Sequence, residues 1–143
     1  MKKYFIAALF LIVAAGCEPK EIDTINVRKI WKVLTVKENG TLVFTNGNAA
    51  NTKPGYSRFR LDLTVTDQVT FSDIDGRNLT GFWSVSKDYK RLILQNLIPP
   101  PSATGGNLEF EIVSSEENKL SLKRTTENRK TGNTINEYQL IPE

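Results

Sequence analysis

The feature that most constrains the fold is an alternation of apolar and polar residues with a period of two. It is clearest in the segment Arg58–Thr66. The apolar members of that segment are Phe59, Leu61, Leu63 and Val65. Successive side chains of a β-strand point to opposite faces, so this pattern predicts a strand with one face in a core and the other in water.

The same period, interrupted by turn residues, recurs from Ile30 to the C-terminus. Asn39-Gly40 and Asp75-Gly76 are typical of tight turns between antiparallel strands. We expect strands over Ile30–Lys37, Thr41–Thr45, Arg58–Thr66, Gln68–Ser72, Leu79–Ser86, Arg91–Leu97, Leu108–Ser114, Leu120–Lys123 and Ile135–Ile141. Sequential strands with short connections pair as a meander, and closing the sheet removes its exposed edges. The sequence therefore predicts an all-β fold, an antiparallel up-and-down barrel of eight or nine strands, with a two-sheet β-sandwich as the alternative.

The N-terminal residues carry a targeting signal. Lys2 and Lys3 precede the apolar run Tyr4–Ala15. A helix needs about 20 apolar residues to cross a bilayer, and this run is too short. The pattern is that of a secretory signal peptide, which we assign to residues 1–16.

The single cysteine follows this signal directly. Val13–Cys17 resembles the lipobox of bacterial lipoproteins, whose cysteine becomes the lipidated first residue of the mature protein. One acyl chain anchors a protein only marginally, whereas several anchor it stably. We expect lipidation of Cys17, a tether over residues 17–28 and a barrel domain over residues 29–143. The expected location is the bacterial cell envelope, attached to the outer membrane on its periplasmic or surface face.

The composition removes most catalytic chemistry. Zero histidines and one cysteine exclude a histidine-based catalytic triad, a histidine metal site and an internal disulfide. Asp73–Gly76 suits a turn stabilised by aspartates better than a calcium loop, because the ligand series of an EF-hand is incomplete. Glu109 and Glu111 alternate with apolar neighbours and are expected in water. We expect a non-enzymatic protein with no catalytic residues, no bound metal and no cofactor.

Charge argues against one class of partner. Signal cleavage would remove Lys2 and Lys3 from the 19 basic residues and leave the 16 acidic residues unchanged. The mature chain would then be close to neutral, without the positive charge that binding to nucleic acid requires. We therefore expect no nucleic-acid partner.

Several strand and turn motifs together point to a family. They are Trp31, Asn39–Thr41, Gly81–Val85, Arg91–Leu94 and Asn136–Pro142. Their order resembles that of small bacterial lipoproteins with a lipocalin-like domain, over residues 28–143. The resemblance implies a β-barrel, a signal peptide and an envelope location, and it supplies no catalytic residues.

Two functions follow as hypotheses. The first is a binding module that holds a small hydrophobic molecule or a glycan at the barrel mouth, with Tyr56, Trp83 and Tyr138 as the candidate ligand-binding residues. The second is an accessory subunit that docks on another envelope protein through the barrel surface. The strand aromatics are expected to fill the core, although they could instead line a cavity. An unfilled cavity under exposed aromatics would favour binding at the mouth, and a filled barrel with an apolar surface patch would favour docking.

Overall fold

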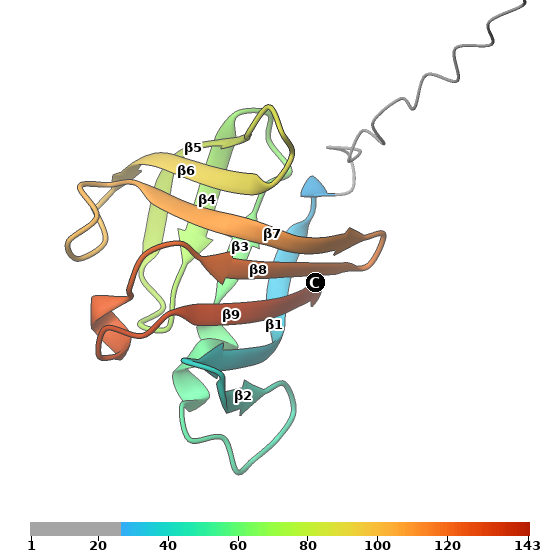
Figure 1. The fold of residues 1–143 in the computed structure, drawn as a ribbon, viewed down its shortest axis with the longest axis vertical. Coiled ribbons are helices and arrows are strands. Elements are labelled where there is room, and N and C mark those ends of the chain that lie inside the picture. The colour runs from blue at the N-terminus through green and yellow to red at the C-terminus, as the bar shows by residue number, and fades with distance from the viewer. Residues whose placement is uncertain (1–26) are drawn as a thin grey trace, which may run out of the picture.

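The structure, a computed structural model, describes residues 27–143, and within them nine strands form one antiparallel sheet that closes on itself (Figure 1). The strands are β1 (Ile30–Glu38), β2 (Thr41–Thr45), β3 (Arg60–Asp62), β4 (Gln68–Ser72), β5 (Asn78–Val85), β6 (Arg91–Ile98), β7 (Leu108–Glu116), β8 (Lys119–Arg124) and β9 (Asn136–Pro142). Two short 3-10 helices, η1 (Pro54–Arg58) and η2 (Arg129–Thr131), lie in the connections.

Strand β1 closes the barrel, because it pairs with three other strands. One edge of β1 pairs with β9, from Trp31 opposite Pro142 to Glu38 opposite Asn136. The other edge is shared, and its first part pairs with β3 and its last part with β2. Eight strands therefore make the closed wall, and β2 is an additional strand beside it. The predicted up-and-down barrel of eight or nine strands is confirmed, and the chain does not form the alternative sandwich.

The outer edge of β2 is covered by the chain that follows it. The amide of Lys53 donates to the carbonyl oxygen of Val43 at 3.2 Å. The side chain of Asn51 accepts from the amide of Thr45 and donates to its carbonyl oxygen. An uncovered strand edge can pair with another chain, so these bonds protect the added strand from edge-to-edge association.

The barrel interior is packed with the apolar residues of the alternating pattern. The ring of Phe59 stacks on that of Tyr138 with centroids 5.0 Å apart, and meets Phe71 edge-on at 5.5 Å. The largest fully buried side chains are Trp31, Tyr56, Tyr138, Phe59, Phe71, Phe110, Leu61, Leu63, Leu79, Leu92, Leu94 and Leu97. An eight-stranded barrel is just wide enough for such side chains to fill it. The expectation that the core is filled by the strand aromatics is confirmed for Trp31, Phe44, Phe59, Trp83, Phe110 and Tyr138.

The strand predicted over Arg58–Thr66 is the largest error of the sequence analysis. Only Arg60–Asp62 is strand, because η1 includes Arg58 and the chain turns after Leu63. Asp62 Oδ1 accepts from the amide of Thr64 at 2.9 Å and from its hydroxyl at 2.6 Å. This local bonding replaces the strand ladder. Val65, which the alternation places inside, is 53% exposed.

The folded part of the chain begins before residue 29. Val27 is buried, and its carbonyl oxygen accepts a hydrogen bond from the Trp31 indole at 2.8 Å. The last residues of the predicted tether therefore pack on the barrel. The predicted signal peptide, Cys17 and the rest of the predicted tether lie outside the described residues. Among residues 27–143, no helix has the length and apolarity needed to cross a membrane.

Candidate ligand-binding groove on the barrel wall

The three candidate residues of the sequence analysis lie in the protein interior. Tyr56 and Tyr138 are fully buried, at the end of the barrel where β1 finishes. Trp83 is 9% exposed and lies near the start of β1, where its indole N–H donates to the carbonyl oxygen of Val65 at 2.9 Å. The structure thus separates Trp83 from the two tyrosines, and does not bring the three together around a mouth.

The two tyrosines belong to a buried hydrogen-bond network. The Tyr56 hydroxyl donates to Glu38 Oε1 at 2.7 Å and accepts from Asn136 Nδ2 at 2.8 Å. The same Asn136 amide donates to the Tyr138 hydroxyl at 3.1 Å, and Lys53 Nζ pairs with Glu38 Oε2 at 2.5 Å. Burial raises the pKa of both tyrosine hydroxyls above the ordinary value. Both stay neutral at physiological pH and serve as hydrogen-bonding groups that close this end of the barrel.

The sequence analysis did not identify two buried acidic residues, Glu38 and Asp73. Glu38 shares the strand face of buried Val36, but alternation counted from Trp31 and Val33 would place it outside, because the pairing shifts between Val33 and Thr35. Asp73 lies in the predicted turn, which is present: its carbonyl oxygen accepts from the Gly76 amide at 2.8 Å. In residues 27–143, no group of His, Cys, Asp and Glu side chains is arranged to hold a metal ion. Both carboxylate oxygens of Glu38 are engaged, one by Tyr56 and the other by Lys53. The polar groups at this end of the barrel therefore bond to one another within the fold.

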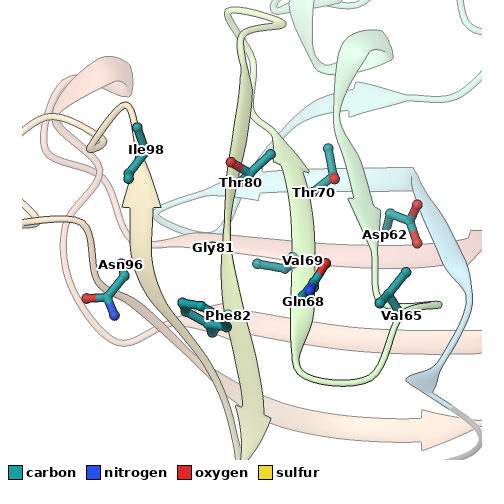
Figure 2. Close-up of a pocket in the computed structure, with 10 residues that line it drawn as sticks. All are labelled: Asp62, Val65, Gln68, Val69, Thr70, Thr80, Gly81, Phe82, Asn96 and Ile98. Carbon is teal, nitrogen blue, oxygen red and sulfur yellow. The ribbon is translucent and has the colours of Figure 1, made fainter.

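One accessible concave surface among the described residues lies on the outside of the barrel, over β3, β4, β5 and β6. It is a shallow groove with a volume of about 340 Å³. Asp62, Val65, Gln68, Val69, Thr70, Thr80, Gly81, Phe82, Asn96 and Ile98 line it, and we call it the wall groove (Figure 2). The volume is at the lower end of the range of about 300–1,000 Å³ for small-molecule sites.

Cross-strand pairing arranges the polar side chains of the wall groove. Asp62 pairs with Thr70, Thr70 with Thr80, and Thr80 with Ile98. A second row is set by Gln68, which pairs with Phe82. Figure 2 shows the Phe82 ring between the side chains of Gln68 on β4 and Asn96 on β6. Side chains on one sheet face are thus held in two adjacent rows by the register of the ladder.

The wall groove contains an exposed aromatic ring beside polar side chains that have no hydrogen-bond partner in the described residues. Phe82 is 51% exposed, whereas its strand neighbour Trp83 is buried. The side chains of Gln68, Thr70, Thr80 and Asn96 make no hydrogen bond to any residue of the described part of the chain. Two amides and two hydroxyls are therefore free to bond a ligand beside an apolar platform.

A glycine and a β-bulge shape the floor of the wall groove. The pairing of β5 with β6 shifts between Thr80 and Phe82, where Gly81 lies opposite Asn96 and Leu97. A Cβ on Gly81 would lie 2.5 Å from the carbonyl oxygen of Gln95, so no other residue fits this approach without movement. Asn96 adopts a positive φ of 53°. Bulges re-aim side chains at the surface of a sheet.

The sequence analysis did not select Phe82, although the signal was present. Period-two alternation places Phe82 opposite Trp83, and an outward Phe on a strand whose other face is buried is an exposed aromatic. The register that brings Gln68 and Asn96 beside it depends on long-range pairing. Comparison of the chain with protein-family models, with curated proteins and with solved structures finds no match.

Proposed function

We propose that this protein is a non-enzymatic, lipid-anchored envelope protein that binds carbohydrate in the wall groove. The observation that carries the proposal is the half-exposed Phe82 ring beside amide and hydroxyl side chains that have no hydrogen-bond partner within residues 27–143. A sugar ring has C–H groups on its faces and hydroxyls on its rim. The negative face of an aromatic ring attracts polarised C–H groups, while amides and hydroxyls bond the rim.

A small hydrophobic molecule fits this molecule less well. Sites for such ligands bury most of the ligand surface, which requires an enclosed cavity. The interior of this barrel is occupied by its own side chains, among them Trp31, Phe59, Phe71 and Tyr138. The wall groove is open, and five of the ten residues that line it have polar side chains. It can cover one face of a ligand and bond its edge, as a sugar requires.

Attachment to the envelope would place the wall groove where glycans are abundant. The proposed anchor is a set of acyl chains on Cys17, and the folded domain begins by Val27. The intervening residues could span about 30 Å when extended. A Cys17→Ala variant should then move from the detergent phase to the aqueous phase, or remain unprocessed. Partitioning into detergent that survives this substitution would contradict the anchor and leave the groove to be judged separately.

The experiment for the wall groove compares two exposed apolar positions. Phe82→Ala removes the platform, while Val113→Ala removes an exposed side chain on β7, away from the groove. We expect the full chain to bind members of a glycan array, Phe82→Ala to weaken that binding at least tenfold, and Val113→Ala to leave it unchanged. Loss of one aromatic stack of about 0.5–1.5 kcal/mol together with its buried area accounts for this size. A chain that binds no glycan, or whose Phe82→Ala variant binds as tightly, would overturn the proposal.

A second candidate function is docking on another envelope protein. Val65, Phe82 and Ile98 border the wall groove and are 53%, 51% and 71% exposed. Such a cluster on a barrel with a filled interior favours contact with a protein surface. Crosslinking from position 98 in whole cells distinguishes the two. Capture of one defined protein together with an empty glycan array would favour docking.

A further inference from the structure

The charge of the wall groove restricts the class of glycan, an inference that rests on the proposed carbohydrate binding. Among the residues that line the groove, Asp62 is the one ionisable side chain, and none is a cation. Acidic glycans carry carboxylate, phosphate or sulfate groups. Their recognition usually involves arginine or lysine, because charge-assisted hydrogen bonds to such groups are the strongest available.

Two arginines beside β3 and the loop that follows it are already engaged. Arg60 Nε pairs with Glu143 Oε2 at 3.0 Å, and its Nη1 donates to two backbone carbonyl oxygens. Arg28 Nη2 donates to the Thr66 hydroxyl at 2.5 Å. Redirecting either guanidinium towards a ligand would break these bonds. The groove therefore offers an acidic ligand repulsion from Asp62 without a compensating attraction.

Asp62 is held in place by the turn that follows β3. Its Oδ1 accepts from the amide and hydroxyl of Thr64, while Oδ2 has no hydrogen-bond partner in residues 27–143. Asp62 pairs in register with Thr70, so the carboxylate stands at one end of the row that runs through Thr80 to Ile98. Four neighbouring strands span about 14 Å at a spacing of about 4.8 Å. This length accommodates a short oligosaccharide lying across the strands.

We infer that the wall groove selects neutral oligosaccharides over acidic ones, with the Asp62 carboxylate at the end of the residue row as the group that sets this selection. At the β3 end, Oδ2 accepts a hydrogen bond that a hydroxyl of a neutral sugar donates. A carboxylate or phosphate of an acidic sugar at the same place meets a like charge. At the β6 end, Ile98 contacts an apolar edge of the ligand. Phe82 and its amide neighbours are common to both ligand classes and set overall affinity.

The test uses an array that pairs neutral oligosaccharides with counterparts that differ by one acidic group. We expect the full chain to bind neutral members about tenfold more tightly than their acidic counterparts, the size of one charge repulsion near a protein surface. Asp62→Asn keeps the acceptor oxygen for Thr64 and removes the charge. The difference in affinity between neutral and acidic members should therefore fall to about threefold or less. Asp67→Asn is the matched control, because Asp67 lies in the loop that follows β3 and outside the groove.

The outcomes separate this inference from the function on which it rests. Equal or tighter binding of acidic members would overturn the selection for neutral ligands while leaving carbohydrate binding intact. A preference for neutral members that Asp62→Asn does not reduce, or that Asp67→Asn reduces equally, would contradict the role of Asp62. If the chain binds no glycan on the array, the proposed carbohydrate binding itself is contradicted. Affinity for neutral members should also be insensitive to added salt, because screening acts on charged pairs.

Discussion

The indole N–H of Trp83 donates a hydrogen bond to the carbonyl oxygen of Val65 at 2.9 Å, which ties β5 to the loop between β3 and β4. That loop places the side chain of Val65 at the border of the wall groove. The amide of Trp83 also donates to the carbonyl oxygen of Asp67 at 3.1 Å. Trp83, a candidate ligand-binding residue by sequence, therefore does not line the groove. It is a positioning residue that holds the loop carrying Val65.

Trp83→Phe should loosen this loop and weaken ligand binding. The substitution removes the indole donor and some buried volume, at a cost of about 1–3 kcal/mol in the free energy of unfolding. Amide hydrogen exchange in residues 64–67 should become faster, and the affinity for glycan should fall several-fold. Both are measured on the same purified variant.

Trp31→Phe is the matched control for this prediction. Trp31 is also buried, and its indole donates to the carbonyl oxygen of Val27 at 2.8 Å, away from the groove. Its substitution should lower the free energy of unfolding by a similar amount and leave glycan affinity unchanged. Equal losses of affinity in the two variants would show that general destabilisation, and no specific effect on the loop, is responsible.

Tyr56→Phe should destabilise the closed end of the barrel. The hydroxyl of Tyr56 joins Glu38 to Asn136, so its loss leaves one buried acceptor and one buried donor without this partner. An unsatisfied buried group costs about 1–3 kcal/mol, which urea denaturation measures as a change in the free energy of unfolding. Tyr89→Phe, at a half-buried tyrosine whose hydroxyl bonds to no described residue, should stay within about 0.5 kcal/mol. Matching losses in the two variants would argue against the network.

Local sequence predicted the elements whose conformation is decided locally. The strand over Thr41–Thr45 has the expected bounds, because Asn39 and Gly40 take the positive φ values, 48° and 82°, that a tight hairpin turn requires. Gln68–Ser72 also agrees residue for residue. Arg58–Thr66 failed because a side-chain bond from Asp62 to the Thr64 backbone competes with the strand, and alternation does not report such competition.

The features that depend on register were beyond local reasoning. A shift in pairing between Val33 and Thr35 of β1 changes the face on which later residues lie, so Glu38 points inward beside Val36. The wall groove has the same origin, since a bulge between β5 and β6 brings Asn96 beside Phe82. An extra residue in one strand of a pair has no fixed sequence signature. The outward position of Phe82, by contrast, follows from the alternation alone.

Gly81→Ala should disturb this bulge. The added Cβ would lie 2.5 Å from the carbonyl oxygen of Gln95 and 3.1 Å from that of Asn96, so β6 must move. We expect a loss of about 1–3 kcal/mol in the free energy of unfolding, together with weaker glycan binding, because Asn96 lines the wall groove. Ser84→Ala, at an exposed position of the same strand, should change neither quantity. A Gly81→Ala variant with unchanged stability would mean that the two strands can separate without cost.

Asp73 and Asp75 should make opposite contributions to the pH dependence of stability. Burial raises the pKa of Asp73 above its ordinary value, and Asp75 adds to this, although the Ile74 amide and the charges of Lys130 and Arg124 oppose it. For Asp75, burial also favours the neutral form, but the hydrogen bond from Lys130 at 2.8 Å and bonds from Arg77 outweigh it. The pKa of Asp75 is therefore lowered.

The sign of each effect follows from linkage. A carboxyl whose pKa is higher in the folded protein stabilises most below the unfolded pKa of about 3.9, and this stability is lost as the pH rises. The free energy of unfolding of Asp73→Asn, relative to that of the natural protein, should therefore increase between pH 4 and pH 7. Asp75→Asn should be less stable than the natural protein at pH 7. This difference in the free energy of unfolding should disappear as the pH falls below about 4. Urea denaturation of the three proteins from pH 3 to pH 7 measures all of these differences. Asp73→Asn could instead lose stability relative to the natural protein as the pH rises. In that case the Asp73 carboxylate is ionised in the folded protein, and Arg124 and Lys130 stabilise it more than burial destabilises it.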